Sequence, residues 1–373
     1  MTTKPAPDQW LAYGQEPGTQ ATYPLSITQN YSGSDVWIPI TVWKGKKPGP
    51  TVCVCAAVHG DEINGTGTIR NIVREQPFEI EAGSLVLVPV VNILGFERHS
   101  RYMPDRRDLN RSFPGTQLGS LSSRIAHSFF TSVIAHCDYC IDLHTAALRR
   151  TNFPNVRADL SDPEIREFAR AFGSVLMISG KGPRGSLRRA ACAMGCKTFI
   201  LEAGEVWKVE PGVVGYATRG IASCLRYLGM IEGTPYKPAY RYETDSTKWL
   251  RATYGGFLEF HIAPGEIIHE GDAIATNTGL AGDEEHLIRA PRDAIVLGMT
   301  TMPSVAPGDP ICHLTFPKKR SLTMIKEAME QIGDDSMHHR LREDLARNLH
   351  VIDHEEAAVV TNDDDGSASG AGG

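Results

Sequence analysis

The sequence has no long apolar segment, no strong charge of either sign and no cysteine spacing typical of a disulfide framework. None of its hydrophobic runs is long enough to span a bilayer, and residues 1–18 are polar and contain proline, unlike a secretory leader. We therefore expect a cytoplasmic protein with no membrane partner. The net charge is −6, of which Asp363, Asp364 and Asp365 contribute three, so the rest of the chain is close to neutral. This balance does not favour a nucleic acid as partner.

The eight cysteines lie mostly in apolar surroundings, as Cys53 and Cys55 do within a strand-like pattern. Such positions favour reduced, buried thiols. A second zinc site built from the pairs Cys137/Cys140 and Cys192/Cys196 is an alternative, but the spacing is irregular for a zinc ribbon. We interpret these cysteines as packing residues.

The composition is that of a soluble globular enzyme, with 373 residues, 41% hydrophobic and 22% charged. Apolar or alternating runs that predict strands alternate with segments of helical periodicity. The expected strands are residues 35–44, 51–58, 84–91, 138–143, 175–179 and 198–202, and the expected helices are residues 64–75, 120–135, 161–173 and 213–228. This order predicts an α/β fold with a mostly parallel, mixed sheet flanked by helices.

After residue 235 the sequence changes to short β-like pieces separated by glycine and proline, and its two halves resemble each other. The region resembles the barrel-sandwich fold of biotinyl and lipoyl modules, although residues 279–285 between the halves lack the lysine that those carriers modify. We predict a catalytic domain over residues 1–234, a small β domain over 235–318, and a charged helical segment with a disordered acidic tail over 319–373. His350 and His354 in this last part have no third ligand nearby, and we assign them no metal.

Two imidazoles and one carboxylate follow strand-like runs. His59 and Glu62 come directly after residues 51–58, and His144 comes directly after the run 139–143. Side chains at the carboxyl ends of neighbouring parallel strands meet at one sheet edge. Two histidines and a glutamate, with one position left for water, form the ligand set of a hydrolytic zinc site. Asp142, two residues before His144, either accepts a proton from an imidazole and fixes its tautomer, or caps the loop or a helix end. We favour the first role.

Glu202 ends another apolar run, residues 198–201. A carboxylate at the end of a buried strand is destabilising by several kcal/mol unless it is paired or used, which indicates a functional role. Next to a zinc-bound water it would accept a proton and return it to a leaving nitrogen. Glu205 is the competing candidate for this role.

Residues 101–115 contain too many arginine and turn residues for a core element. They form either a solvated loop or a substrate-binding segment. The Asn110-Arg111 pair favours the second interpretation, because a guanidinium matches a carboxylate in a two-point contact and the amide fixes its direction. A further arginine near the metal would stabilise an oxyanion.

Four motifs, at residues 59–62, 108–111, 142–144 and 201–204, resemble those of the succinylglutamate desuccinylase/aspartoacylase family, a branch of the zinc carboxypeptidase fold. The resemblance covers roughly residues 51–233. It implies one zinc ion per subunit with His59, Glu62 and His144 as metal ligands. It also implies Glu202 as general acid/base, substrate carboxylate binding by Asn110 and Arg111, and an oxyanion arginine before residue 108. We choose Arg101 for that arginine and keep Arg107 as the alternative.

The sequence therefore predicts a zinc-dependent amidohydrolase that removes an acyl group from an N-acyl amino acid or a related small carboxylate, and it is compatible with a homo-oligomer. A metallocarboxypeptidase that acts on short peptides would use the same residues, and a non-catalytic binding protein is the alternative from another class. The sequence does not determine which acyl group is removed. An acyl group with its own carboxylate needs another cation, which Arg184, Arg188 or Arg189 would supply unless residues 180–189 are a solvated loop.

Overall fold

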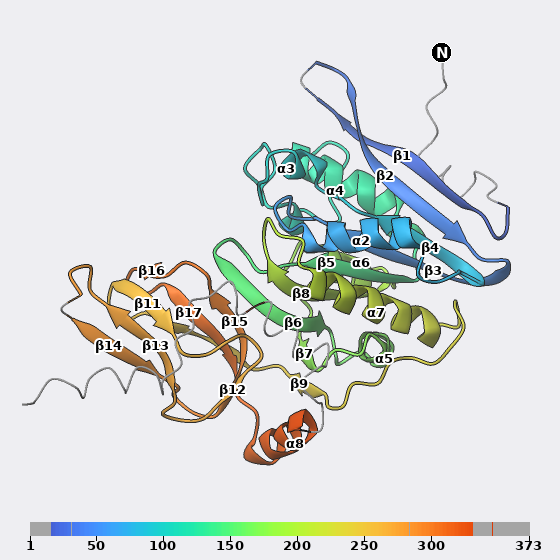
Figure 1. Ribbon diagram of the computed structural model, residues 1–373. Coiled ribbons are helices and arrows are strands. Elements are labelled where there is room, and N and C mark those ends of the chain that lie inside the picture. Colours follow the sequence, from blue (N-terminus) through green and yellow to red (C-terminus); the bar gives the residue numbers. More distant parts are fainter. Residues whose placement is uncertain (1–15, 31, 283, 331–344, 346–373) are drawn as a thin grey trace, which may run out of the picture.

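The computed structural model describes residues 16–30, 32–282, 284–330 and 345 (Figure 1). Its strands are β1 Gln20–Gln29, β2 Asp35–Lys44, β3 Lys47–Ala56, β4 Ala82–Val88, β5 Tyr139–His144, β6 Arg150–Ala158, β7 Leu176–Ser179, β8 Lys197–Glu205, β9 Tyr242–Thr244, β10 Thr247–Arg251, β11 Gly256–Phe260, β12 Ile267–Ile268, β13 Ala273–Thr278, β14 Glu285–Arg289, β15 Ala294–Thr300, β16 Ser304–Val305 and β17 Pro310–Thr315. Its helices are α2 Asn64–Glu75, α3 Ile93–Phe96, α4 Leu121–Ser132, α5 Pro163–Ala171, α6 Leu187–Ala193, α7 Pro211–Tyr227 and α8 Lys319–Glu330, with short 3₁₀ turns η1 Leu109–Arg111 and η2 Ile134–His136.

The largest element of the fold is a mixed sheet of 13 strands. Its main path runs β1-β2-β4-β3-β5-β8-β6-β15-β17-β10, and β7, β9 and β12 pair beside it. The centre of the sheet, β4-β3-β5-β8, is parallel, as predicted from the buried apolar runs, whereas both flanks are antiparallel. The predicted mixed α/β fold is confirmed, and α2 occupies the expected residues 64–75.

Helices cover both faces of this sheet. On one face α2, α5 and α7 share a hydrophobic cluster with Val52 and Val54 of β3, and on the other α4 and α6 share a second cluster with Cys53 and Cys55. The alternation follows from the two-residue period of a strand, which points successive side chains to opposite faces. A parallel strand buried on both sides must therefore be apolar throughout, and residues 52–55 are fully buried.

All eight cysteines are free, and seven are buried. The structure does not bring together the four cysteines considered for a zinc ribbon. Instead, the thiols of Cys53, Cys55 and Cys140 come within 4.8 Å of one another inside the core that α4 covers. Hydrogen bonds between the thiols, together with burial, hold the pKa of Cys53 and Cys55 well above the ordinary value, as expected for packing residues.

The sequence-based prediction did not include β1, α3, β6 or α6. The segment Arg150–Ala158 contains a proline and several polar residues, so it has no clear strand pattern. It forms β6 because β8 on one side and β15 on the other provide hydrogen-bonding partners.

The strands after residue 235 are divided between the large sheet and a second, smaller sheet. β15 pairs with β6, so the large sheet continues across the predicted boundary at residue 234, while β14-β13-β11-β16 form a second sheet of four strands. The two parts appear in Figure 1 as an α/β lobe and a smaller β lobe side by side. The barrel-sandwich resemblance stays a prediction.

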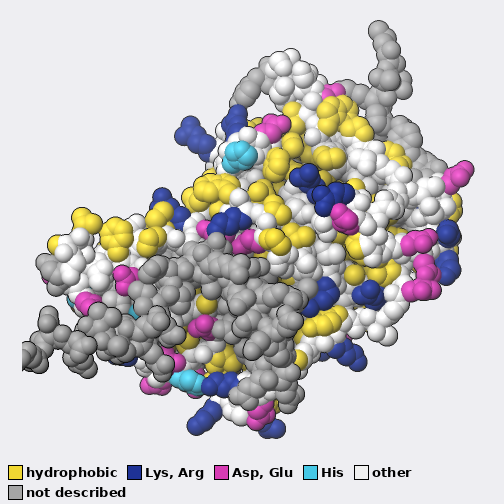
Figure 2. Space-filling model, in the orientation of Figure 1, with side chains coloured by type: hydrophobic (Ala, Val, Ile, Leu, Met, Phe, Trp, Pro, Cys, Tyr) yellow, Lys and Arg dark blue, Asp and Glu magenta, His cyan; other side chains and the backbone are white. Residues whose placement is uncertain are grey.

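The C-terminal part of the chain is described only as far as α8, which matches the start of the expected helical segment. The rest of that segment apart from Leu345, the acidic tail, and His350 and His354 lie outside the described residues. None of the helices that the structure describes is both long and apolar enough to cross a membrane. On the face shown in Figure 2, acidic and basic side chains are interspersed, which agrees with the near-neutral charge.

Candidate active site

The four motifs of the sequence meet at the carboxyl edge of the central strands. His59 and Glu62 lie in the loop between β3 and α2, and His144 is the last residue of β5. Glu202 lies on the next strand, β8, directly opposite His144 in the parallel register. The strand continues to Glu205, so Glu202 is inside the strand rather than at its end.

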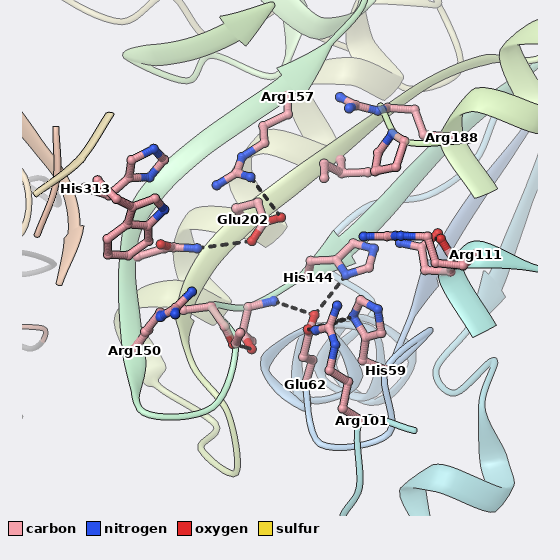
Figure 3. A pocket seen from close by; sticks show the side chains of 18 residues that line it. His59, Glu62, Arg101, Arg111, His144, Arg150, Arg157, Arg188, Glu202 and His313 are labelled. Carbon is pink, nitrogen blue, oxygen red and sulfur yellow. Dashed lines mark hydrogen bonds and ion pairs between the residues drawn. The ribbon is translucent and has the colours of Figure 1, made fainter. Parts of the chain in front are cut away.

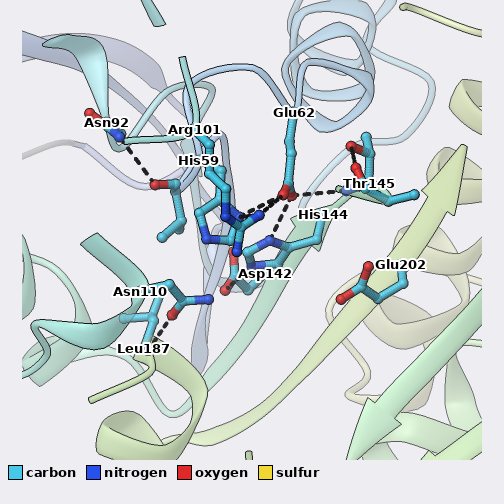
Figure 4. A network of polar contacts seen from close by, with 12 residues as sticks. His59, Glu62, Asn92, Arg101, Asn110, Asp142, His144, Thr145, Leu187 and Glu202 are labelled. Atoms are coloured by element: carbon cyan, nitrogen blue, oxygen red, sulfur yellow. Dashed lines mark hydrogen bonds and ion pairs between the residues drawn. The ribbon is translucent and has the colours of Figure 1, made fainter. Parts of the chain in front are cut away.

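The Glu62 carboxylate lies between the two imidazoles (Figure 4). Its Oε1 is 2.7 Å from Nδ1 of His59, and its Oε2 is 2.8 Å from Nδ1 of His144 and accepts a hydrogen bond from the Thr145 backbone N–H at 3.0 Å. All three side chains are buried, and one ligand atom from each lies within 4.8 Å of the others. The structure therefore brings the three predicted metal ligands together, and all three line one cavity.

The outward nitrogen of each imidazole contacts another carboxylate. Nε2 of His144 is 2.8 Å from Oδ2 of the fully buried Asp142, as expected from the sequence, and Nε2 of His59 is 3.2 Å from Oδ1 of Asp108. Asp108 belongs to the Asp-Leu-Asn-Arg motif but had been given no role. A carboxylate behind each imidazole orients the ring and increases its basicity, which is the arrangement found behind metal-bound histidines.

The pKa values of His59, His144 and Glu62 are set by the neighbouring charges, whose effect opposes and outweighs that of burial. Burial alone would lower the pKa of His144 and His59, but Asp142, Glu62 and Asp108 raise both pKa values above the ordinary one. Burial would likewise raise the pKa of Glu62, but the two imidazoles hold it well below its usual range. The cluster thus keeps its carboxylate ionised and attracts positive charge to its centre.

Of the two arginines considered for the oxyanion, only Arg101 reaches the cluster. Its Nη1 donates to Oε1 of Glu62 at 2.9 Å and lies 3.3 Å from Nδ1 of His59. The side chain of Arg107 is 65% exposed, lies 3.9 Å from the Asp105 carboxylate and does not line the cavity. The structure therefore places Arg101, and not Arg107, next to the predicted metal ligands.

Two residues of β6 flank the Glu202 carboxylate. Asn152 donates from Nδ2 to Oε2 at 3.1 Å, and Nη1 of Arg157 lies 3.7 Å from Oε1 (Figure 3). Sequence reasoning missed both, because only the antiparallel pairing of β6 with β8 brings them there. The competing Glu205 points elsewhere: it pairs with Lys208 and accepts a hydrogen bond from Thr301 at 2.6 Å.

Asn110 and Arg111 lie in the 3₁₀ turn η1, whose start is capped by the Asp108 side chain. The buried Asn110 accepts a hydrogen bond at Oδ1 from the Leu187 backbone N–H of α6 at 2.8 Å, which leaves its amide NH₂ as the donor. Arg111 donates to the Asn110 carbonyl at 2.7 Å. Both side chains line the same cavity as the histidines.

This cavity encloses about 270 Å³ and is rich in arginine. Besides Arg101 and Arg111, it is lined by Arg150, Arg157 and Arg188, whereas its only carboxylates among the described residues are Glu62 and Glu202. Of the three arginines considered as an additional cation, Arg184 and Arg189 are exposed and only Arg188 faces the cavity. Arg188 is 7% exposed, and its buried Nη1 has no hydrogen-bond partner in the described structure.

The β lobe contributes one wall of the cavity. Trp249 of β10 stacks on its register partner His313 of β17, with ring centroids 4.7 Å apart, and the Arg150 guanidinium lies 4.7 Å above the Trp249 ring. Burial, together with Arg157 and Arg150, lowers the pKa of His313 to about 3, so the ring is neutral near pH 7. Nothing in the local sequence indicates this role, since it depends on the continuation of the sheet from β6 into β15 and β17.

The chain is similar to known acyl-amino-acid hydrolases. Residues 48–228 match the succinylglutamate desuccinylase/aspartoacylase catalytic domain. The chain is 27% identical over 355 residues to N-alpha-acetyl-L-2,4-diaminobutyric acid deacetylase from Halomonas elongata, covering 86% of this chain and 99% of that protein.

Two solved structures share the fold. A succinylglutamate desuccinylase/aspartoacylase from Rhodobacter sphaeroides is 26% identical, with a TM-score of 0.68 over 81% of this chain and 97% of that chain. A succinylglutamate desuccinylase from Silicibacter sp. TM1040 is 23% identical, with a TM-score of 0.69 over 80% and 94% of the two chains.

Proposed function

We propose that this protein, whose residues 48–228 match the succinylglutamate desuccinylase/aspartoacylase catalytic domain, is a zinc-dependent amidohydrolase that removes the acyl group from an N-acyl amino acid. The observation that carries the proposal is the meeting of His59, Glu62 and His144 next to Glu202 in one small cavity. The deacetylase from Halomonas elongata, which aligns along nearly its whole length, supports the same reaction class.

The donor set suits zinc. His59, Glu62 and His144 offer two nitrogens and one carboxylate, a combination that leaves a coordination position open for catalysis. Asp108 and Asp142 support the rings from behind, as second partners of metal-binding histidines do. When bound, zinc supplies a Lewis acid that polarises a carbonyl and lowers the pKa of water to about 7.

Glu202 acts as the proton carrier. It accepts the proton of the attacking water and delivers it to the nitrogen that leaves as the amine. Asn152 and Arg157 hold its two oxygens, so the carboxylate faces the cavity in one orientation. Arg101, which already reaches the ligand cluster, stabilises the negative charge that develops on the carbonyl oxygen.

Asn110 and Arg111 bind the α-carboxylate of the substrate. The guanidinium provides a charge-assisted, two-point contact, and the Asn110 amide provides a third donor whose direction Leu187 fixes. With the carboxylate held there, the scissile carbonyl is directed toward the metal and Glu202. Orientation of this kind contributes a large share of the rate enhancement in reactions of bound substrates.

The charge of the cavity favours an additional anionic group on the substrate. Arg188 is buried with a free Nη1, and Arg150 and Arg157 lie on the same cavity. A cationic side chain, as in the diaminobutyric acid named for the Halomonas elongata protein, needs a carboxylate partner, and both cavity carboxylates are engaged in catalysis. We therefore propose that N-acyl derivatives of acidic amino acids, or acidic acyl groups, are preferred here.

A substrate panel tests the function. Purified protein loaded with zinc is assayed with acetyl, formyl and succinyl derivatives of alanine, aspartate, glutamate and 2,4-diaminobutyrate, and with tripeptides. Zinc-dependent release of the free amino acid is expected, with acidic derivatives preferred. Release of C-terminal residues from tripeptides alone would instead identify a carboxypeptidase, which the small cavity walled by Trp249 and His313 disfavours. Absence of all hydrolysis by protein containing zinc would refute the proposal.

A further inference from the structure

Two buried polar residues outside the cavity, Asn64 and Glu210, are joined by a reciprocal pair of hydrogen bonds. Asn64, the first residue of α2, donates from Nδ2 to Oε2 of Glu210 at 2.7 Å, and the Glu210 backbone N–H donates to Oδ1 of Asn64 at 2.7 Å. Asn64 is 1% and Glu210 8% exposed, and neither lines the cavity. We call this pair the Asn64–Glu210 clasp.

The clasp also holds the end of strand β8. Oε2 of Glu210 accepts a second hydrogen bond from the Glu205 backbone N–H at 3.0 Å, and Nδ2 of Asn64 lies 3.3 Å from the Glu205 carbonyl. Gly204 makes this approach possible: its φ is +74°, and a Cβ there would lie 2.0 Å from Oε2 of Glu210. The clasp thus joins the residue that follows the Glu62 loop to the segment that follows Glu202.

Two backbone hydrogen bonds extend the connection. The Gly204 carbonyl accepts from the Ala146 N–H at 3.0 Å, two residues after His144, and the Asp61 carbonyl accepts from the Trp207 N–H at 2.9 Å. The segments that carry the metal ligands and the proton carrier are therefore tied together at residues 203–210.

A tie of this kind is needed because of the sheet topology. Glu62 follows β3 and Glu202 lies on β8, and β5 separates the two strands. The ladders connect β3 and β8 only through β5, so contacts beyond the strand ends supply the direct tie between the two segments that carry these carboxylates. A buried carboxylate that accepts two hydrogen bonds makes stronger contacts than a neutral acceptor would.

We infer that Asn64 and Glu210 are positioning residues, which set the distance between the Glu62 ligand cluster and Glu202. The inference rests on the proposed role of Glu202. Since a misplacement of about 1 Å can reduce turnover on the order of 100-fold, a disturbed clasp should lower kcat. It should leave KM nearly unchanged, because Asn110 and Arg111 belong to a different segment, and leave the zinc content unchanged.

The test exchanges the two functional groups of the clasp. Asn64→Asp opposes two buried carboxylates, and we expect kcat to fall on the order of 100-fold with KM within about 3-fold of the original chain. The double variant Asn64→Asp with Glu210→Gln restores an amide facing a carboxylate, and kcat should recover by at least about 10-fold over the single variant. Asn71→Asp, the same change elsewhere on α2, serves as the control and should have no effect.

A second readout does not depend on activity. In metal-free protein, amide hydrogen exchange over residues 203–210 should be faster in Asn64→Asp and return toward the original rate in the double variant. If Asn64→Asp does not fold, Glu210→Gln and the double variant are compared in the same two assays. The inference is overturned by a folded Asn64→Asp with unchanged kcat, or by a double variant no better than the single one. If the original chain hydrolyses nothing but exchange follows the expected pattern, the proposed function fails while the clasp stands.

Discussion

Replacement of Glu202 by glutamine tests the chemistry most directly. Glutamine keeps the size of the side chain and can still accept the hydrogen bond from Asn152, but it cannot accept a proton. We expect Glu202→Gln to bind zinc and substrate normally and to lose most of its turnover.

The expected loss of turnover in Glu202→Gln is much larger than the expected loss of folding stability. A positioned proton carrier contributes about 10²- to 10⁴-fold to the rate, which corresponds to about 3–5 kcal/mol of transition-state stabilisation. Among the described residues, the substitution removes one ion pair of Glu202, that with Arg157, at 3.7 Å and partly exposed to solvent. Such a pair contributes less than about 1 kcal/mol to folding. The effect on kcat should therefore greatly exceed any effect on unfolding.

Glu205→Gln is the matched control. Glu205 lies three residues further along the chain, and its side chain contacts Lys208 and Thr301 outside the cavity. This variant should keep kcat while losing a small amount of stability. Steady-state kinetics, zinc content and thermal unfolding are measured for both variants.

The outcome that contradicts this reasoning is specific. A zinc-loaded Glu202→Gln that keeps kcat within about 3-fold would remove Glu202 from the mechanism, because general acid–base catalysis contributes far more than that. If Glu205→Gln were the variant that lost kcat, the two carboxylates would exchange roles.

Three further predictions follow from the contacts around the site and the fold. Asp142→Asn should weaken zinc binding about 10- to 100-fold, because His144 loses its carboxylate partner; competition with a chelator measures this, and unchanged affinity would contradict it. Arg111→Lys should raise KM about 10-fold or more with a smaller change in kcat, because lysine cannot make the two-point contact; an equal loss in both parameters would argue against a binding role. Glu243→Gln should lower the free energy of unfolding by about 1 kcal/mol near pH 7. Burial opposes ionisation of Glu243, but Arg170 and Arg166 hold its pKa below the ordinary value. The ionised side chain therefore contributes its full stabilisation above the unfolded-state pKa of about 4.3. This stabilisation is lost as the pH falls through the lower pKa of the folded state. Denaturation curves at neutral and acidic pH check this, and a difference that persists in acid would refute it.

Much of the fold was readable from hydrophobic pattern because the central strands are buried on both faces. Residues 51–58, 84–91 and 138–143 are apolar runs of strand length, and they became β3, β4 and β5 with shifts of a few residues. The antiparallel flanks were harder to predict. β6 contains a proline and polar residues, and it is a strand because of its two neighbours and not because of its own pattern.

The sequence by itself indicated which side chains meet, since His59 and Glu62 follow one apolar strand run, His144 follows another, and the carboxyl ends of parallel strands share one sheet edge. Only the tertiary structure brought Arg101 rather than Arg107 to Glu62, brought Asn152 and Arg157 to Glu202, and placed Trp249 and His313 on the cavity wall. These contacts depend on loop paths and on pairing between strands far apart in the chain. Local periodicity carries no information about such pairing, because it reports only which face of each element is buried.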